Sequence, residues 1–451
     1  MPDAELGSKL STKLNRLSEI ASQKPTLKFT SLAHLLDKEC LKESYTELNP
    51  KAVAGIDGVS YKEYGKELEA NIERLVERLK SGEYRAVDIR RAWIPKPDGG
   101  RRPLGILVLE DKIVQRGVAR ILSAIYEQDF LDSSYGFREG RNAHEALRAI
   151  ELSIMQGGVN CLLDVDIRGY FDHIDREWLM KMLHERIADR TILRLIGKWL
   201  KVGVLEEGKR ISTELGVPQG SVISPILSNI YLHYVLDLWI KCVVAHQVKS
   251  RVYLIRFADD YVIGCTNRQD AQKVWEMLPA RLEKFGLEIA KEKSRLIEFG
   301  QIAYMRSRQN GCKLSTFDFL GFTHYMTSDR KGMPKLGRKT IGKRMRRTLI
   351  ALNDKLRRLR NAMPVQELYK YLCRILKGYY NYFGFAGNAA TLNKFADVVK
   401  KMWFKWLNRR SQKKSFNWDE FIAFHKQYPL PKPKIDRGYS WIYGRQDCES
   451  V

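Results

Sequence analysis

Cysteine and long apolar runs are scarce in this chain of 451 residues. Its seven cysteines are scattered without a C-x-x-C pair, which argues against zinc ribbons and disulfide frameworks. The beginning, "MPDAELGSKLSTKLNRL", lacks the apolar core of a signal peptide. The most apolar window, "VISPILSNIYLHYVLDLWIKCVVA", is interrupted by Ser224, Asn229, His233, Asp237 and Lys241, so it predicts a buried helix. These absences favour a cytoplasmic protein, in the cytoplasm or nucleoid of a bacterium, without a membrane partner.

Acidic residues are too few to balance the basic ones. The chain has 53 Asp and Glu against 78 Lys and Arg, which gives a net charge of +25. A positive field of this size attracts polyanions, meaning nucleic acid or an anionic membrane surface. Since no spanning segment is evident, nucleic acid is the expected partner.

The chain is long enough for two to four compact units, and 44% of its residues are hydrophobic. We expect an N-terminal extension over residues 1–85. Within it, apolar residues recur at helical spacing from Tyr61 to Lys80, and Gly82 is a plausible stop. The segment "RAWIPKPDGGRRPLGI" then predicts two strands joined by a Pro/Gly turn. Residues 86–330 mix helices with short apolar strands, an α+β pattern.

The composition changes after "FDFLGFTHYM". From residue 331 to 360 there are twelve Lys or Arg and one acid. One apolar face of a basic helix is predicted by Met345, Leu349, Leu352, Leu356 and Leu359. Further helical patterns cover Val365 to Tyr382 and Thr391 to Leu407. We expect a helical module over 331–412 and a basic, proline-containing tail over 413–451.

Two adjacent acids interrupt an apolar, β-prone stretch, "YLIRFADDYVIG". Neighbouring carboxylates beside a core are costly unless a cation or hydrogen bonds offset them. The simplest alternative is a tight turn, because Asp is common in turns. A second acid in a similar setting, Asp166 in "CLLDVDIRGYFDHI", weakens that alternative. Mg²⁺ prefers carboxylate oxygens, and strand-end carboxylates at Asp166, Asp259 and Asp260 could hold two such ions. Asp164 shares a strand face with Asp166, so spacing alone does not choose between them.

An ordered series of motifs resembles the reverse transcriptases encoded by group II introns. Its palm motifs are "DVDIRGYFDHI", "GVPQGSVISPILSNIYL" and "RFADDYVIG", and "WIPKPDGGRRPLGI" and "YGFREGRNAHEAL" resemble finger motifs. The last palm segments are "GLEIAKEKSRLIEFG" and "FDFLGFTHY". The resemblance covers most of the chain from about residue 30. It implies a right-hand polymerase, with fingers and palm on a small antiparallel sheet followed by an α-helical thumb and maturase domain. Residues 1–85 would then include the first finger segment, and residues 86–330 the fingers and palm.

The resemblance implies that Asp166, Asp259 and Asp260 are catalytic and bind two Mg²⁺ ions, for which Mn²⁺ could substitute. Phe257 stands where the family often has Tyr. Phe171 resembles the aromatic residue under the sugar of the incoming nucleotide, where a ring excludes a 2′-hydroxyl; an ordinary core Phe is the alternative. Gln219 resembles a glutamine that lies near the nucleotide and the template; the alternative is an ordinary loop residue.

The remaining implied contacts are electrostatic. Lys96 and Arg102 flank the finger turn, where they could bind a triphosphate; the alternative is that both are solvated charges. Lys293 is a weaker candidate for binding the triphosphate. After residue 331 the basic segment resembles the thumb and maturase region. Phosphate contacts are expected from five residues there, namely Lys339, Lys343, Arg344, Arg346 and Arg347. Aromatic residues of "LKGYYNYFGFAG" could stack on bases, but helix packing is favoured for them.

The leading hypothesis is an RNA-directed DNA polymerase that extends a DNA primer with dNTPs on an RNA template, binds intron RNA and assists splicing and mobility. The residues beyond 400 contain one His and one Cys, so the resemblance is to members that lack an endonuclease domain. One alternative is a non-catalytic RNA-binding splicing factor. Another is a reverse transcriptase co-opted for phage defence or spacer acquisition. The particular RNA, the insertion target and the oligomeric state are not encoded in any recognisable motif.

Overall fold

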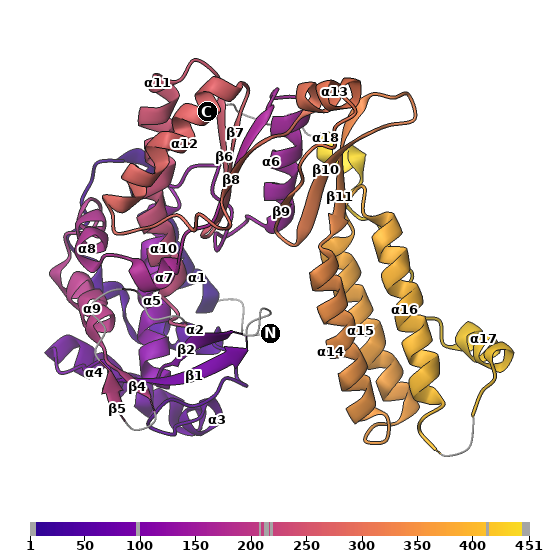
Figure 1. Cartoon of the computed structure of the whole chain (residues 1–451). Coiled ribbons are helices and arrows are strands. Elements are labelled where there is room, and N and C mark those ends of the chain that lie inside the picture. Colours follow the sequence, from indigo (N-terminus) through magenta and orange to yellow (C-terminus); the bar gives the residue numbers. More distant parts are fainter. Residues whose placement is uncertain are drawn as a thin grey trace. The chain divides into compact units, whose positions relative to one another are not determined.

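The computed structural model of the chain describes residues 6–95, 100–206, 209–211, 216, 220–411 and 415–443 (Figure 1). The chain divides into two compact units. The first unit comprises residues 1–146, 165–262 and 272–295, and the second comprises 147–164, 263–271 and 296–451. Each unit is described below by itself.

Helices make up most of the N-terminal part of the first unit. They are α1 (Leu6–Gln23), η1 (Ala33–Leu35), α2 (Lys38–Thr46), α3 (Tyr61–Tyr64), η2 (Gly65–Glu67), α4 (Leu68–Ser81) and α5 (Leu109–Tyr126). The predicted helix after Tyr61 is thus present in three pieces. It ends where predicted, because Gly82 adopts the left-handed conformation (φ 80°) that glycine favours at a helix C-terminus.

The predicted basic hairpin is confirmed. Strands β1 (Ile89–Pro95) and β2 (Arg101–Ile106) pair antiparallel, with Ile94 opposite Arg102. They belong to a four-stranded sheet in the order β2-β1-β4-β5, completed by β4 (Val204–Glu206) and β5 (Lys209–Ile211). Helices α8 (Arg176–His184) and α9 (Arg190–Lys201) precede β4.

The apolar window is helical, as predicted, and is buried over most of its length up to Ile240. It consists of α10 (Ser224–Leu232), the π-helical segments η3 (His233–Asp237) and η4 (Ile240–Val244), and α11 (Ala245–Gln247). All the residues of α10 except Pro225 are buried. Among the described residues, no helix is both long enough and apolar enough to cross a bilayer.

A second four-stranded sheet has the order β6-β7-β3-β8. Its strands are β6 (Val252–Phe257), β7 (Asp260–Cys265), β3 (Cys161–Val165) and β8 (Arg295–Glu298). Helices α6 (Ala143–Met155), α7 (Tyr170–His173), α12 (Arg268–Glu283) and α13 (Gln301–Gln309) lie next to these strands in the sequence. The strands β6 and β7 are the two apolar flanks of the aspartate pair, so the pair lies at a hairpin turn.

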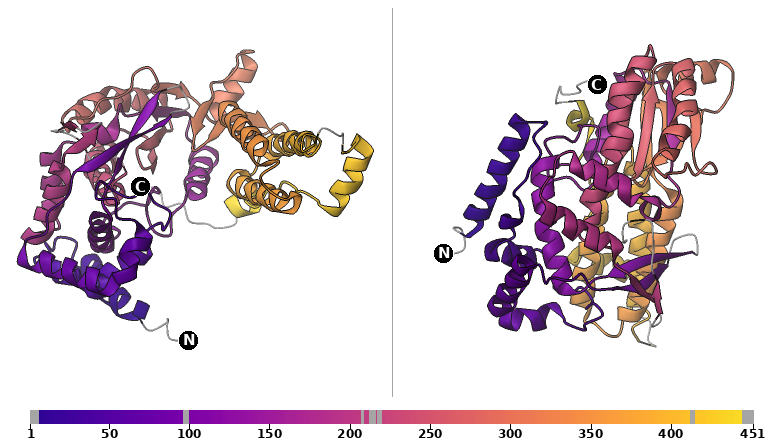
Figure 2. Two further views of the ribbon diagram at one scale, coloured as in Figure 1. Left: turned by 90° about the horizontal axis from the view of Figure 1, so that it is seen from below. Right: turned by 90° about the vertical axis from the view of Figure 1, so that its left-hand side faces the viewer.

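The second unit contains a three-stranded sheet and a group of helices. Strands β9 (Phe317–Phe319), β10 (Phe322–Ser328) and β11 (Pro334–Thr340) form the order β11-β10-β9. Helices α14 (Gly342–Leu359), α15 (Val365–Phe383) and α16 (Ala389–Leu407) run alongside one another in both Figure 1 and Figure 2. Two shorter helices follow, α17 (Trp418–Gln427) and α18 (Tyr439–Tyr443).

The packing of α14 follows the predicted apolar face, since Leu352 and Leu356 are buried. Its partners α15 and α16 bury leucines and large aromatic residues, including Phe395 and Trp403. The basic positions in the first turns of α14 are mostly exposed. The helix therefore contributes one face to the core of the second unit and presents a cationic face outward.

Candidate active site

The aspartate pair lies on a tight hairpin of the first unit. Ala258 and Asp259 form the turn between β6 and β7, and Asp260 begins β7. Ala258 has a φ of 58°, which is unusual for a residue with a Cβ. Asp259 is half-buried and Asp260 is exposed. The hairpin therefore presents both carboxylates at the end of the sheet.

Asp166 follows the last residue of β3, the strand that neighbours β7. The backbone nitrogen of Asn160, just before β3, donates to the oxygen of Cys265 at the end of β7 at 3.0 Å. The charge of Asp166, just after β3, acts on Tyr261 at the start of β7, so the two strands run antiparallel. Continuing this register residue by residue brings Asp166 opposite Asp259. Burial, reinforced by the charge of Asp166, raises the pKa of Tyr261, which follows Asp260.

Asp166 also lies beside a cation. The Lys293 ammonium is 3.4 Å from Asp166 Oδ2, and both side chains are about half exposed. The Asp166 backbone nitrogen donates to Ser294 Oγ at 3.0 Å, and its carbonyl accepts from the Ala290 nitrogen at 2.8 Å. These bonds fix the end of β3 against residues 290–294. The geometry thus favours Asp166 over Asp164 as the partner of the hairpin, and it brings Lys293 to the same place.

The donor set at this place fits a divalent cation. Mg²⁺ binds through one or two carboxylates, keeps several waters and takes further oxygens from substrate phosphates. Within the part of the chain that the structure describes, no group of three or more His, Cys, Asp or Glu side chains is arranged to hold a metal ion by itself. The arrangement of Asp166 and the hairpin, with the Lys293 ammonium in contact with Asp166, suits an ion that shares its ligands with a nucleotide.

Phe171 lies on α7, five residues after Asp166. Its ring makes an edge contact with Tyr170 at a centroid distance of 5.2 Å, and its side chain is partly exposed. A fully buried core residue, the alternative stated above, does not describe it. Its role under a nucleotide sugar stays a prediction.

Three predicted nucleotide contacts fall at the edge of what the structure describes. Lys96 and Gln219 lie outside the described residues, and Arg102 is described only through its backbone in β2. The described glycines on either side of Gln219 pack closely: a Cβ on Gly216 would lie 2.8 Å from the Phe171 carbonyl oxygen, and one on Gly220 would lie 2.8 Å from that of Gly105.

The predicted phosphate contacts belong to two kinds of element. Lys343, Arg344, Arg346 and Arg347 are exposed in the first turns of α14, as expected. Lys339 does not lie on a helix, because residues 334–340 pair with β10 as strand β11. The expectation that the basic segment after residue 331 is helical throughout is therefore wrong for its first part. Lys339 is exposed, with its ammonium over the Tyr325 ring at 5.6 Å.

Most of the aromatic cluster of α15 is packing, as favoured from the sequence, whereas Tyr382 is only half-buried. Tyr379, Tyr380 and Phe383 are buried, and Tyr379 stacks on Phe395 of α16 at 3.8 Å. Phe385, just after α15, is fully buried. These rings hold the second unit together and are not accessible to unpaired bases.

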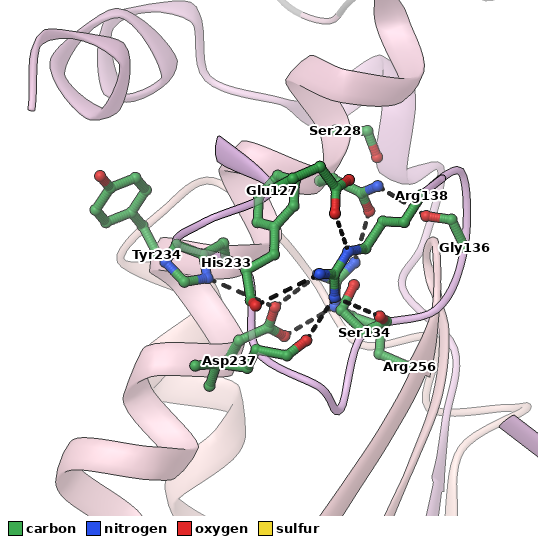
Figure 3. Close-up of polar contacts among 12 residues, drawn as sticks. Glu127, Ser134, Gly136, Arg138, Ser228, His233, Tyr234, Asp237 and Arg256 are labelled. Atoms are coloured by element: carbon green, nitrogen blue, oxygen red, sulfur yellow. Dashed lines mark hydrogen bonds and ion pairs between the residues drawn. The ribbon is translucent and has the colours of Figure 1, made fainter. Parts of the chain in front are cut away.

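A buried polar network supports the hairpin that carries Asp259 and Asp260, and sequence reasoning missed it (Figure 3). Arg256, in β6, and Asp237, in η3, are fully buried and paired through two hydrogen bonds of 2.8 and 2.6 Å. Arg256 also donates to Asn229 Oδ1 at 3.0 Å and to the Ala258 carbonyl at 3.1 Å. Ala258 directly precedes Asp259, so this guanidinium fixes the turn. The sequence signal for it was a charged residue inside the apolar strand "YLIRF".

A glycine lets a second segment approach the same turn. A Cβ on Gly136 would collide with the Ala258 nitrogen and lie 2.9 Å from the Phe257 carbonyl carbon. The Gly136 carbonyl accepts from Asn229 Nδ2 at 2.8 Å. Asn229 therefore joins the two segments, since it bonds both Gly136 and Arg256.

His233 borders this network and gives it a pH dependence. Burial lowers its pKa from 6.5 to about 4, against the opposing effect of Asp237, while Arg256 and Arg138 lower it further. The unfolded chain therefore binds a proton between pH 6.5 and 4 that the folded chain does not. We expect stability to fall as pH falls through this window, by up to about 3 kcal/mol from this residue.

The measurement is urea unfolding at pH 7 and pH 4.5 for the wild type and His233→Met. Methionine fills irregular core spaces and does not titrate. The variant should lose less stability on acidification than the wild type. Equal losses in the two proteins would show that His233 is not the group responsible.

Comparisons with known proteins agree with this geometry. Residues 94–324 match the family "Reverse transcriptase (RNA-dependent DNA polymerase)", and residues 343–420 match "Group II intron, maturase-specific domain". Protein YkfC of Escherichia coli is 36% identical over 231 residues, which cover 50% of this chain and 61% of that protein. The group II intron-encoded protein LtrA of Lactococcus lactis is 28% identical over 475 residues, covering 86% of this chain and 76% of that protein.

The first match spans just over half of the chain and contains the Asp166 strand end and the Asp259–Asp260 hairpin. The second begins in the basic helix α14. The motif resemblance is therefore confirmed: the chain belongs to the reverse transcriptase family, among the members that carry a group II intron maturase-specific domain.

Proposed function

We propose that the protein is an RNA-directed DNA polymerase that extends a primer with dNTPs on an RNA template. The observation that carries this proposal is the position of Asp166 at the end of β3, beside the Asp259–Asp260 hairpin on the neighbouring strand. Two carboxylate-bearing strand ends that meet at one edge of a sheet suit phosphoryl transfer with divalent ions.

Asp166 and Asp259 would hold the ions, with Asp260 beside them. Bound Mg²⁺ would favour attack by the primer 3′-hydroxyl on the α-phosphate and stabilise the leaving pyrophosphate. The protein's own contribution is positioning and charge. Lys293, already at the Asp166 carboxylate, can move its ammonium to a triphosphate oxygen when the nucleotide arrives. Lys96, Arg102 and Gln219 are proposed to contact the nucleotide, and the Phe171 ring to select against a 2′-hydroxyl.

A primer-extension assay tests the polymerase proposal. Purified protein with Mg²⁺, an annealed DNA primer and an RNA template should produce full-length cDNA from dNTPs. It should make little product from rNTPs, and Phe171→Ala should raise rNTP incorporation at least about tenfold. Complete absence of product with Mg²⁺ and with Mn²⁺ would remove the proposal.

We further propose that α14 binds intron RNA and thereby assists splicing and mobility. Lys343, Arg346 and Arg347 are exposed and lie away from the packed face that contains Leu352 and Leu356. The Arg344 guanidinium instead lies over the rings of Tyr382 and Phe383. An exposed basic face supplies affinity for phosphates that depends on salt and little on sequence.

Arg346→Ala combined with Arg347→Ala should weaken binding of a structured RNA at a moderate salt concentration. The slope of log K against log salt should become shallower by roughly 0.7 to 0.9 for each phosphate that the protein no longer neutralises. Fluorescence anisotropy over a salt series measures this. The matched control, Arg346→Lys with Arg347→Lys, keeps the charge and should keep the slope; equal slopes for the Ala pair and the wild type would contradict the assignment.

A further inference from the structure

Phe137 has a backbone conformation that its residue type disfavours. Its φ is 57°, in the left-handed region where a Cβ is crowded. Among the described residues, three that are not glycine have a positive φ, namely Phe137, Leu320 and Ala258, which lies in the turn before Asp259. Strained residues of this kind are concentrated at functional sites.

The Phe137 side chain is also exposed. Its exposed fraction is 60%, although Ser134, Tyr135, Gly136 and Arg138 around it are all buried. A large aromatic ring in water forgoes the stabilisation that burial gives. Both the backbone and the side chain of Phe137 are therefore in unfavourable states, and neither contributes to the packed core.

Buried hydrogen bonds hold the residues on either side of Phe137, and Figure 3 shows two of these, Gly136 and Arg138. On one side the Gly136 carbonyl accepts from Asn229 Nδ2 at 2.8 Å. On the other, Arg138 donates to Glu127 Oε2 at 2.9 Å and to the Ser134 carbonyl at 2.7 Å. The backbone conformation is thus held by buried hydrogen bonds on both flanks, so the ring projects into solvent from a fixed point of the backbone.

That position is beside the catalytic turn, within the first unit. The backbone N–H of Tyr135 donates a hydrogen bond to the Arg256 carbonyl at 2.8 Å, and Gly136 packs against Ala258. Phe137 is therefore one residue away from a contact with the residue that precedes Asp259. No other residue of the segment 134–138 is exposed.

We infer that Phe137 is a nucleic-acid contact whose ring stacks on an unpaired template base next to the primer terminus. The inference rests on the proposed polymerase function. A rigid, exposed ring suits this task because stacking on an aromatic face accepts every base, which a polymerase requires. The ring acts as a positioning residue for the primer terminus and does not touch the metal ions.

A thermodynamic cycle between protein and nucleic acid tests the inference. Binding of an RNA template annealed to a DNA primer is measured by anisotropy without dNTPs, using Phe137→Ala and templates with an abasic site at successive positions around the primer terminus. Phe137→Ala should raise the Kd about tenfold. At one position the abasic site should raise the Kd of the wild-type protein by a similar factor and leave the Kd of Phe137→Ala unchanged. Phe137→Tyr should restore binding to within about twofold.

Stability separates this role from a structural one. Phe137→Gly relieves the backbone strain, so its melting temperature should equal or exceed that of the wild type while its Kd rises as for Phe137→Ala. Ile302→Ala, a similarly exposed apolar residue at 58%, should leave the Kd unchanged. An unchanged Kd for Phe137→Ala, or additive effects at every abasic position, would overturn the inference. So would a variant that changes only oligomeric state in light scattering, which would assign the ring to a protein contact.

The two proposals can fail separately. If the wild-type protein extends primers and the Phe137 variants bind primer–template as tightly as the wild type, only the stacking role is removed. Wild-type protein that extends no primer removes the polymerase function itself.

Discussion

Asp259→Asn is expected to lower the single-turnover rate of primer extension by at least about a thousandfold, with little effect on melting temperature. The substitution keeps the shape of the side chain and removes the charge that would hold a divalent ion. Loss of several kcal/mol of transition-state stabilisation corresponds to a rate change of this size. Because Asp259 is half-buried at a turn, the fold depends little on its charge. Rapid-quench extension on an RNA template gives the rate.

Asp318→Asn is the matched control, since Asp318 is an exposed strand residue of β9 in the second unit. Its rate should be within about twofold of the wild type. Asp259→Asn protein that keeps more than a tenth of the wild-type rate would contradict the assigned role. The same variant separates the alternatives: if it still promotes splicing of a matching intron, RNA binding and polymerisation are independent functions of one chain.

Asp237→Ala should lower the free energy of unfolding by about 3–5 kcal/mol, because it leaves the fully buried Arg256 guanidinium without its carboxylate. Replacing both partners by apolar residues, as in Arg256→Met with Asp237→Leu, should recover most of that stability. The double variant should nevertheless remain a poor polymerase, since it lacks the hydrogen bond from Arg256 to the Ala258 carbonyl. Urea unfolding and extension rates are both needed.

The second unit supplies the control for this experiment. Arg338 and Glu151 form another fully buried ion pair, far from the catalytic turn in the sequence. Glu151→Ala should lower stability by a similar amount, and the folded fraction should extend primers at a rate close to that of the wild type. If the Arg256–Asp237 double variant is as active as the Glu151 variant, the ion pair supports the fold and has no role in positioning the turn.

Much of the architecture was predictable because local signals and packing agree. The periodicity after Tyr61, the stop at Gly82 and the antiparallel pairing of β1 with β2 all correspond to observed elements. The apolar face of α14 was likewise readable from leucine spacing. In contrast, β11 was read as part of a helical module, because strand pairing with β10 is a tertiary contact that basic composition does not reveal.

The site was predictable where chemistry is concentrated in a short motif and not where it depends on contacts between distant segments. Asp166, Asp259 and Asp260 stand out as acids in apolar strands. Asn229 and Gly136 do not, because their importance comes from contacts made across the fold with Arg256 and Ala258. Spacing could not choose between Asp164 and Asp166, whereas the register between β3 and β7 favours Asp166.

The most direct test of the proposed two-metal site is anomalous diffraction from crystals of the protein with a primer–template, an incoming nucleotide and Mn²⁺ in place of Mg²⁺. We predict two manganese peaks roughly 4 Å apart, with carboxylate oxygens of Asp166 and Asp259 among their ligands. A well-ordered nucleotide complex without manganese between Asp166 and the 259–260 turn would contradict it.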